Sequence, residues 1–354
     1  MTSRERVLNT FHRVKADRIP MDFSANPTIL RKLMAALNVD DFEKLLSALQ
    51  IDFRSVGVPY VGKPLFSEKP GLWVDPVYGF YCHWVENDWG GYNDFCEFPL
   101  QGADSEVIAA FPVPDPDDFD YSGVYDYVSQ MEDYACFVGN AGFADVINSA
   151  GRVMGMEDIL VNLMTEDEGT MTYINRVADM QLGQLERTIE AGKGKFTFLW
   201  MGEDLGTQHS PMISLELYRK LLRPIHQKFI DLAKSYGLPV MVHSCGSSSW
   251  VYEDFIEMGV DAVDTLQPEA TNMSPGYLAE HFGGRLSFHG CISTAGPLAY
   301  GSPDEVEKQV RETIEIMKPN CGYMLSPAHM IQDNSPVENV LRMYEAGLRY
   351  GKYE

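Results

Sequence analysis

Short apolar segments alternate with longer amphipathic segments along most of this chain, and this alternation constrains the fold more than any other feature of the sequence. Val240 to His243 has the length and composition of a buried strand, and it follows a helical pattern, Leu215 to Tyr236, that ends before a glycine and a proline. Strands that alternate with helices in this way form parallel sheets. Eight segments qualify as strands: Ile19 to Phe23, Phe53 to Val58, Phe137 to Asn140, Phe196 to Met201, Val240 to His243, Ala262 to Leu266, Leu286 to His289 and Tyr323 to Ser326. The sequence therefore predicts an α/β fold, and the number of strands fits a barrel.

Two predicted helices begin with the same signal. In Ser302-Pro303-Asp304-Glu305, a serine cap precedes a proline at the first helical position and acidic residues in the first turn, which predicts a helix through Val306 to Met317. Ser335-Pro336-Val337-Glu338 repeats the pattern and is expected to start the last helix in the same way.

One segment departs from the alternation. Residues 62–115 are rich in Trp, Tyr, Phe, Gly and Pro, and they follow the second predicted strand. An insertion of this length after a barrel strand is expected to cover the barrel mouth as a lid or pocket wall. Tyr81, Trp84 and Trp89 are candidates for lining a flat apolar substrate pocket, although the aromatic residues could equally form a small core within the insertion. We expect residues 1–354 to form one domain.

Composition excludes several classes of protein. The formal net charge of −23 argues against nucleic-acid binding, which needs a basic surface. Six cysteines are too few for a disulfide scaffold, and no apolar run of about 18 residues could span a membrane. The charged beginning of the chain lacks an apolar signal core, so a cytoplasmic location is expected. The oligomeric state is open, a homodimer included.

Histidine and cysteine follow two of the predicted strands. His243 and Cys245 come at the end of one strand, and Cys291 comes at the end of another. Because the carboxyl ends of barrel strands gather around one mouth, these side chains are expected to converge there. Imidazole and thiolate are ligands that zinc prefers. The sequence therefore predicts a zinc site.

Other polar residues near strand ends complete the predicted site. Glu203 is the expected fourth ligand, with Asp204 as the alternative or as a group that orients a metal-bound histidine. His329 follows the last strand and is a candidate general acid, or a structural hydrogen-bonding group. His289 is expected to be a hydrogen-bonded histidine rather than a ligand. Cys321 precedes the last strand, which places it at the opposite end of a barrel.

Four motifs resemble the uroporphyrinogen decarboxylase superfamily, and the similarity runs from about Arg4 to the end of the chain. They are Gly202-Glu203-Asp204-Leu205-Gly206-Thr207-Gln208, His243-Ser244-Cys245-Gly246, Phe288-His289-Gly290, and the segment from Ser326 to Asn339. The resemblance implies a (β/α)8 TIM barrel. It also implies one of two chemistries: a decarboxylase without a cofactor, or a zinc-dependent methyltransferase that works with a corrinoid protein.

The residues near the first strand discriminate between these two chemistries. The decarboxylase binds a substrate with eight carboxylates through arginines in an Arg-Gln-Ala-Gly-Arg-Tyr run, and this chain has Asp22-Phe23-Ser24-Ala25-Asn26-Pro27 there. Serine and asparagine do not replace a bidentate arginine. In the methyltransferase branch a His-x-Cys pair and a later cysteine hold zinc. His243 and Cys245 match the pair, whereas the later cysteine is either Cys291 or is replaced by His329.

The sequence therefore favours a zinc-dependent methyltransferase. The enzyme would move a methyl group between a small substrate and a corrinoid cofactor (cobalamin) on a partner protein, because this chain has no Asp-x-His-x-x-Gly corrinoid motif of its own. The aromatic insertion favours O-demethylation of a methoxylated aromatic compound, with a thiol as the alternative methyl acceptor. A uroporphyrinogen decarboxylase and a non-catalytic metal- or corrinoid-handling protein are the alternative functions.

Overall fold

The computed structural model describes residues 1–88 and 90–354, and its centre is a curled sheet of seven parallel strands. The strands follow one another in the sheet in the order in which they occur along the chain. Their bounds are β1 Phe53–Val56, β5 Ala135–Gly139, β6 Phe198–Gly202, β7 Val240–His243, β8 Ala262–Thr265, β9 Ser287–Ile292 and β10 Tyr323–Pro327. Seven of the eight predicted strands are thereby found.

The eighth predicted strand, Ile19 to Phe23, takes the place of a strand without forming one. Its backbone bridges the two edges of the sheet, because Asp22 donates its N–H to Leu325 in β10 and Asp52, just before β1, donates its N–H to Met21, both at 2.9 Å. The pairing with β10 at Met21 is an isolated bridge. The prediction of a strand is therefore wrong for this segment, although the segment occupies the position of a barrel strand. The α/β barrel architecture is confirmed.

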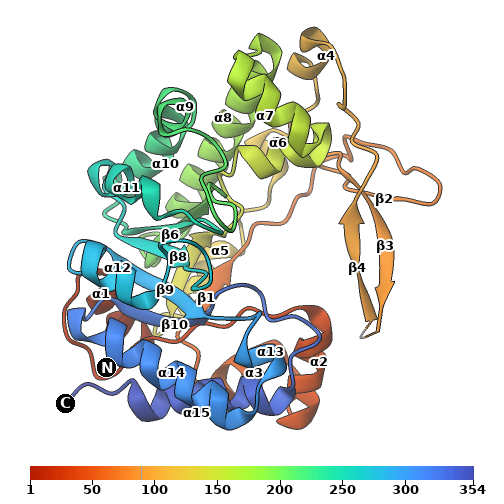
Figure 1. Ribbon diagram of the computed structural model, residues 1–354. Helices are drawn as coiled ribbons and strands as arrows, with labels where there is room; N and C mark the ends of the chain where they lie inside the picture. Colours follow the sequence, from red (N-terminus) through yellow and green to blue (C-terminus); the bar gives the residue numbers. More distant parts are fainter. Residues whose placement is uncertain (89) are drawn as a thin grey trace.

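Helices cover the outer face of the sheet (Figure 1). The segment predicted as one helix from Leu215 to Tyr236 runs continuously through α9, a π-helical turn η2 and α10. The helices are α1 Ser3–Phe11, α2 Pro27–Ala36, α3 Phe42–Ala48, α4 Ser105–Ala109, η1 Pro116–Asp118, α5 Val124–Gln130, α6 Ile147–Met154, α7 Met156–Thr165, α8 Glu168–Ala191, α9 Leu215–Leu217, η2 Tyr218–Leu222, α10 Arg223–Ser235, η3 Ser249–Val251, α11 Tyr252–Met258, α12 Pro275–Phe282, α13 Pro297–Tyr300, α14 Pro303–Met317, η4 Lys318–Asn320 and α15 Val337–Tyr350. Among the described residues, no helix combines the length and apolar character needed to cross a bilayer.

The two predicted helix starts differ in the structure. Ser302 caps α14 through a reciprocal capping box with Glu305, as expected. The last helix begins at Val337 with Pro336 at the cap position and no side-chain cap, so the prediction of a serine cap there is wrong. Ser335 is buried and its hydroxyl has no hydrogen-bond partner among the described residues.

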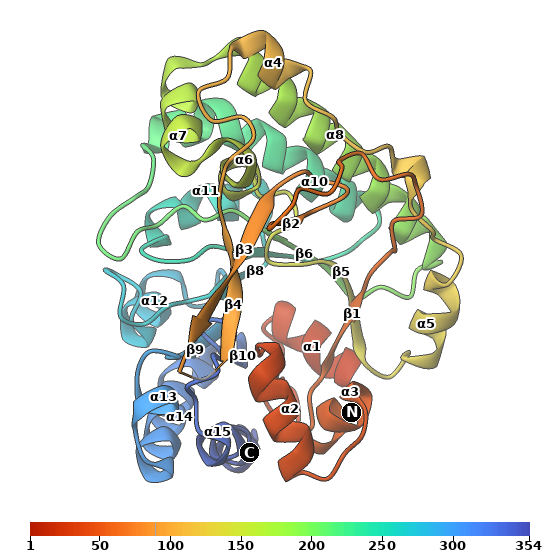
Figure 2. The same ribbon diagram turned by 90° about the vertical axis from the view of Figure 1, so that its right-hand side faces the viewer.

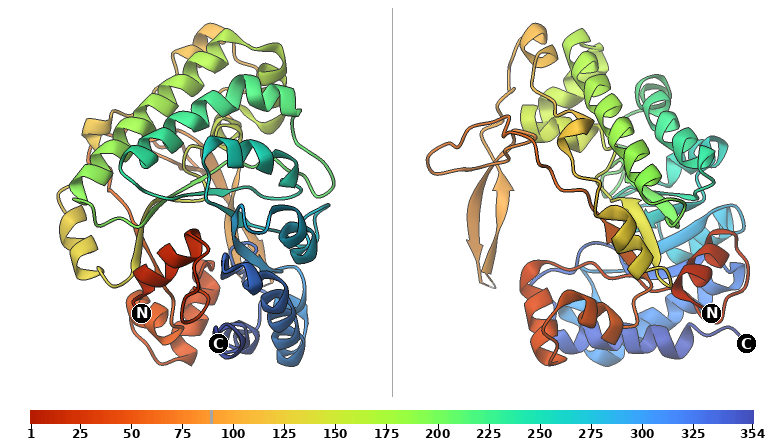
Figure 3. Two further views of the ribbon diagram at one scale, coloured as in Figure 1. Left: turned by 90° about the vertical axis from the view of Figure 1, so that its left-hand side faces the viewer. Right: turned by 180° about the vertical axis from the view of Figure 1, so that it is seen from behind.

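Helix α1 closes the amino-terminal end of the barrel (Figure 3). Its residues Val7 and Phe11 belong to an inner core that also contains Phe53, Phe137 and Phe198 from β1, β5 and β6. The ring centroids of Phe11 and Phe198 lie 5.0 Å apart. Because these aromatic side chains fill the amino-terminal end, the open end of the barrel is the one formed by the carboxyl ends of the strands.

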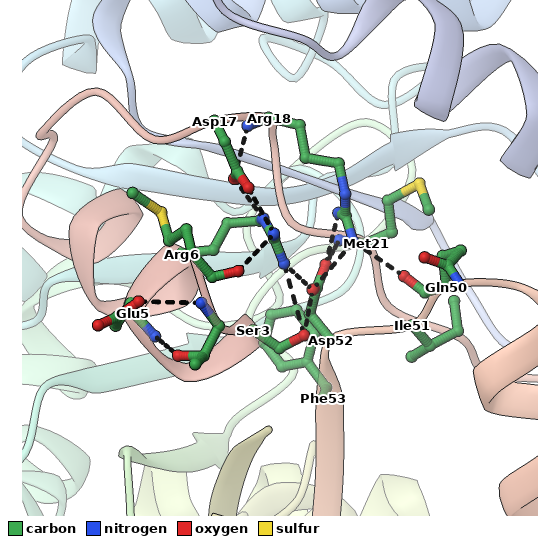
Figure 4. A network of polar contacts seen from close by, with 12 residues as sticks. Ser3, Glu5, Arg6, Asp17, Arg18, Met21, Gln50, Ile51, Asp52 and Phe53 are labelled. Carbon is green, nitrogen blue, oxygen red and sulfur yellow. Dashed lines mark hydrogen bonds and ion pairs between the residues drawn. The ribbon is translucent and has the colours of Figure 1, made fainter. Parts of the chain in front are cut away.

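A buried carboxylate ties α1 to the sheet (Figure 4). Asp52 is fully buried and accepts hydrogen bonds from Arg6 at 2.6 Å, from Arg18 at 2.7 Å and from the backbone N–H of Met21 at 2.8 Å. Arg6 also pairs with Asp17. Because each cation faces a carboxylate, the network fixes both α1 and the bridging segment against β1.

The predicted insertion after β1 contains a small antiparallel sheet of β2 (Trp73–Val74), β3 (Tyr81–Asn87) and β4 (Gly90–Phe95). Figures 1 and 2 show the β3–β4 hairpin standing in front of the carboxyl ends of the barrel strands. The insertion therefore faces the end of the barrel at which the polar strand-end residues gather.

Candidate metal centre

Two glycine-containing loops at the ends of β6 and β7 lie backbone against backbone. Gly246 has φ of +70°, and a Cβ atom there would lie 2.3 Å from the carbonyl oxygen of Gly206. The loops are joined by hydrogen bonds from the N–H of Ser247 to the oxygen of Thr207 and from the N–H of Leu205 to the hydroxyl of Ser244. The glycines in the two sequence motifs therefore permit a contact that no other residue allows.

This contact brings three potential metal ligands together. Among the described residues, Asp204, His243 and Cys245 form the group of His, Cys, Asp or Glu side chains whose ligand atoms lie within 4.8 Å of one another. His243 Nε2 lies 3.3 Å from Cys245 Sγ and 3.5 Å from Asp204 Oδ1. One thiol, one imidazole and one carboxylate match a catalytic zinc site, which uses three protein ligands and keeps one position for substrate.

Asp264 at the end of β8 orients the imidazole of His243. Its Oδ2 lies 2.6 Å from Nδ1 of His243, and its other oxygen faces Nδ1 of His289. Burial alone would raise the pKa of Asp264, but the two histidines lower it well below its usual range. The ionised carboxylate can only accept, so Nδ1 of His243 keeps its proton, and Nε2 is the nitrogen that would give up its own proton to bind a metal.

For His243 and Cys245, burial shifts the pKa in one direction and the neighbouring side chains shift it in the other. Burial would lower the pKa of His243, but its hydrogen bonds with Asp264 and Cys245 raise it well above its ordinary value. Burial raises the pKa of the Cys245 thiol, and the hydrogen bond with His243 opposes that shift. A nearby cation favours the thiolate, which is the form that binds a metal.

Helix α6 holds the carboxylate of Asp204. Asn148 donates its side-chain N–H to Asp204 Oδ2 at 2.8 Å and also to Asp145 Oδ2 at 2.9 Å. The N–H of Cys245 donates to Asp204 Oδ1 at 2.9 Å. Asp204 is therefore fixed from two sides, with its Oδ1 turned toward the histidine and the cysteine.

Glu203, the predicted fourth ligand, points the other way. Its fully buried carboxyl group accepts the N–H groups of Val146 and Ile147 at the start of α6 and lies 3.2 Å from Nε2 of His226. Burial raises the pKa of Glu203 to about 8 and lowers the pKa of His226 to about 4. Both groups are therefore neutral at pH 7, and the structure does not bring Glu203 into the ligand group.

Cys291, the predicted third ligand, also lies outside that group. Gly290 has φ of +119° and Cys291 has φ of +69°, so the alternation of side chains along β9 breaks at this point. The thiol lies in the core cluster between the sheet and the outer helices, and burial raises its pKa. Its role as a ligand stays a prediction, and its side chain belongs to the packing outside the barrel.

Of the remaining predicted site residues, His329, Tyr81 and Trp84 lie at or beyond the mouth. His329 is exposed after β10, where its Nδ1 is 3.4 Å from the side-chain nitrogen of Gln332. Tyr81 lies under the ammonium group of Lys69, and Trp84 is 58% exposed on the hairpin. Trp89 lies outside the described residues. The structure therefore does not gather His329, Tyr81 and Trp84 around the ligand group.

A cavity of about 570 Å³ adjoins the loop after β5. Its apolar walls include Val56 in β1, Phe80 in the insertion and Tyr173 in α8, and Ser149 and Arg152 of α6 also line it. Because Asn148 on the same helix holds Asp204, one helix contributes both to this cavity and to the ligand group.

The sequence interpretation missed Asp264 and Asn148. Asp264 carries a detectable signal, because it is an acid inside a predicted strand that is otherwise uncharged, and a buried strand seldom contains a carboxylate without a partner. Asn148 has no comparable signal, because its contact with Asp204 depends on how α6 packs. His289 is hydrogen-bonded, as expected. Burial would lower the pKa of its imidazole, but the neighbouring carboxylate of Asp264 outweighs burial and raises this pKa to about 9.

Comparisons with known proteins give a family and a fold. A methylated-thiol–coenzyme M methyltransferase from Methanosarcina mazei is 26% identical over 203 residues, which cover 55% of this chain and 48% of that protein, so this chain spans about half the length of the relative. A solved structure of a methyltransferase from Methanosarcina mazei has the same fold, with a TM-score of 0.68 at 14% identity over 99% of both chains. Residues 128–350 match the family described as uroporphyrinogen decarboxylase (URO-D). The chain belongs to the uroporphyrinogen decarboxylase family.

Proposed function

We propose that this protein is a zinc-dependent methyltransferase. It moves a methyl group between a small methylated substrate and the corrinoid cofactor of a partner protein. The observation that carries the proposal is the convergence of Asp204, His243 and Cys245 within 4.8 Å at the open end of the barrel. The partial relative and the solved structure of the same fold, both named as methyltransferases, support it.

Asp204, His243 and Cys245 would hold the zinc ion. When bound, zinc acts as a Lewis acid toward the oxygen or sulfur that loses or receives the methyl group. Asp264 keeps the proton of His243 on Nδ1, so that Nε2 is free to bind. Asn148 keeps Oδ1 of Asp204 facing the same point. Asp204 thus takes the place that the sequence assigned to Glu203, and Cys291 is left as a ligand candidate for experiment.

His329 is the proposed general acid for a departing oxygen. Methyl transfer to a corrinoid leaves the electron pair of the C–O bond on the oxygen, which then needs a proton. His329 lies at the open end of the barrel, is exposed, and has a ring nitrogen within reach of Gln332. These features allow its ring to exchange protons with solvent.

A methoxylated aromatic compound is the favoured methyl donor, and a thiol is the alternative acceptor. The cavity beside the loop after β5 has aromatic walls that include Phe80, Phe143 and Tyr173. Aromatic walls pack well against a flat ring. Its volume of about 570 Å³ lies in the range of small-molecule sites.

Uroporphyrinogen decarboxylation is the weaker alternative despite the family name. The position at which that activity would require arginines has Asp22, whose carboxylate lies 3.2 Å from Nε2 of His289 inside the barrel. A carboxylate there repels an acidic substrate, whereas eight substrate carboxylates need several cations. Release of carbon dioxide from uroporphyrinogen by the purified protein would restore this alternative.

A methyl-transfer assay tests the proposal. Zinc-loaded protein is mixed with methoxyarenes or methylated thiols and cob(I)alamin, and conversion to methylcobalamin is followed by absorbance. We expect turnover with at least one donor, and a loss of about 100-fold or more in His243→Ala. Cys321→Ser, at the opposite end of the barrel, is the control and should keep full activity. Equal turnover in His243→Ala and the wild type would overturn the proposal.

A further inference from the structure

The cavity beside the metal group has a lining that contrasts with the rest of the protein. The chain carries a formal net charge of −23. Among the described residues, the lining of the cavity nevertheless contains no aspartate and no glutamate. Its single cation is Arg152, and its other polar side chains are neutral, such as Asn140, Ser149, Gln181 and Gln184. Acidic groups that are common elsewhere are therefore absent where a ligand would bind.

Arg152 has no carboxylate partner in the described part of the chain. Its guanidinium group lies 5.4 Å from the ring centroid of Phe95, and its side chain is half-buried. The buried Arg54, by contrast, pairs with Glu43 at 2.6 Å, and the half-buried Arg4 and Arg13 donate to backbone carbonyl groups. A guanidinium group that is partly removed from water gains from a bidentate carboxylate. Arg152 is thus a cation available to a ligand.

The other residues that line the cavity indicate what the uncharged part of that ligand is. Tyr78 and Phe80 of the insertion face the cavity together with Phe143 and Tyr173. A flat ring would contact these aromatic side chains, while its acidic group would reach Arg152. One cation matches one negative charge, so a ligand with many carboxylates would leave most of them unpaired.

The cavity shares its wall with the metal group. Gly139 at the end of β5 pairs with Trp200 in β6, and the N–H of Gly202 donates to the oxygen of Phe143. On α6, Ser149 lines the cavity and the preceding residue, Asn148, holds Asp204. A ligand in the cavity therefore lies against the same loop and helix that position the ligand group.

We propose that this cavity binds a methoxylated aromatic monocarboxylate and that Arg152 pairs with its carboxylate. The assignment of this ligand as the methyl donor rests on the proposed function. Its binding does not, because the cavity walls lack all three members of the metal group. Arg152 and the aromatic walls thus divide the recognition of one small molecule between its acidic group and its ring.

Direct binding tests the proposal without a corrinoid. 4-Methoxybenzoate and its uncharged analogue 4-methoxybenzamide are titrated calorimetrically into the wild type and into Arg152→Met. We expect the acid to bind the wild type and to bind Arg152→Met at least about tenfold more weakly. The amide should bind both proteins within about threefold of each other. Arg311→Met, an exposed arginine on α14, is the matched control and should bind the acid as the wild type does.

Two further variants keep the outcome decisive. Val177→Phe narrows the cavity from α8 and should weaken the acid and the amide alike, which also covers the case in which Arg152→Met does not fold. Cys245→Ser should retain acid binding even if it loses zinc. If the acid binds with the expected dependence on Arg152 but no methyl transfer occurs, the proposed function is wrong and the assignment of the cavity stands. Equal binding of the acid to the wild type and Arg152→Met, or no binding to the wild type at millimolar ligand, would overturn the assignment of the cavity.

Discussion

Asp264 Oδ2 and His243 Nδ1 lie 2.6 Å apart, which fixes the ring orientation of a potential metal ligand from the neighbouring strand. Asp264→Asn keeps the shape of the side chain but replaces an acceptor with an amide that can donate. We expect the affinity for zinc to fall by about 10- to 100-fold. Competition with a chromophoric chelator measures this affinity, and Asp304→Asn on the surface of α14 is the control. Unchanged affinity would show that His243 is oriented by other contacts.

The two strand-end cysteines should differ in their effect on metal content. Cys245→Ser removes the thiol within 3.3 Å of His243 Nε2, so we expect zinc to fall from about one per chain to a small fraction. Cys291→Ala alters only the core outside the barrel and should leave zinc unchanged, with a modest loss of stability. Metal analysis after dialysis measures both. Loss of zinc in Cys291→Ala would return Cys291 to the ligand set.

Substitutions of the adjacent acids Glu203 and Asp204 should also differ in their effect on zinc affinity. Asp204→Asn weakens the ligand that faces His243, so we expect zinc affinity to fall by about tenfold or more. Glu203→Gln replaces a buried neutral acid with a neutral amide and should retain zinc. Chelator competition on the matched pair decides the question. The opposite ranking would assign the fourth ligand to Glu203.

Gly246 should be more sensitive to substitution than a glycine with the same backbone conformation. Gly237→Ala, at φ of +72° with no atom within 4 Å of the new Cβ, should cost about 1 kcal/mol of unfolding free energy. Gly246→Ala adds a contact at 2.3 Å with the oxygen of Gly206, so we expect a further loss of about 1–3 kcal/mol and weaker zinc binding. Urea unfolding measures the difference. Equal costs would mean that the loop can move away.

Asp17 gives the protein an acid-sensitive contribution to stability. The hydrogen bond from Arg6 lowers the pKa of Asp17 from 3.8 to about 2. A lowered pKa stabilises the folded state above pH 4, and this contribution is lost as the pH falls from about 4 to about 2. The full shift corresponds to about 2.4 kcal/mol, but the side chain is 45% exposed, so solvent screening reduces it to about 1 kcal/mol.

Asp17→Asn tests this pH dependence. The variant should unfold about 1 kcal/mol more easily than the wild type at pH 7 and equally easily near pH 2. Urea unfolding at the two pH values measures both differences, and Glu280→Gln, an exposed acid on α12, should show neither. A difference that persists at low pH would assign the effect to something other than the charge of Asp17.

Much of the fold is readable from the sequence because breakers and apolar runs coincide with the true ends of strands. Val240 to His243 is predicted to the residue, since a glycine and a proline separate it from the preceding helix. The segment from Ile19 to Phe23 has the residue pattern of a strand, but it pairs with the sheet only through isolated backbone contacts. Such contacts depend on the two sheet edges between which the segment lies, and no local pattern encodes them.

The candidate site was less accessible to sequence analysis than the fold. His243, Cys245 and Asp204 come together because two loops contain the glycines needed for close approach, and both motifs are visible in the sequence. The sequence predicts Cys291 at the mouth because it follows a predicted strand, but at Gly290 and Cys291 the backbone turns to positive φ. Side-chain direction at a strand end depends on such local dihedral angles, which the residue pattern alone does not determine.

The backbone hydrogen bond from Asp22 to Leu325 joins two segments that are far apart in the sequence. During translation, β1 is made well before β10, so the barrel cannot close until the segment that contains Leu325 has left the ribosome. Unpaired edges invite association with other chains. The sheet therefore exposes an edge to other chains for as long as the residues between β1 and β10 are being made.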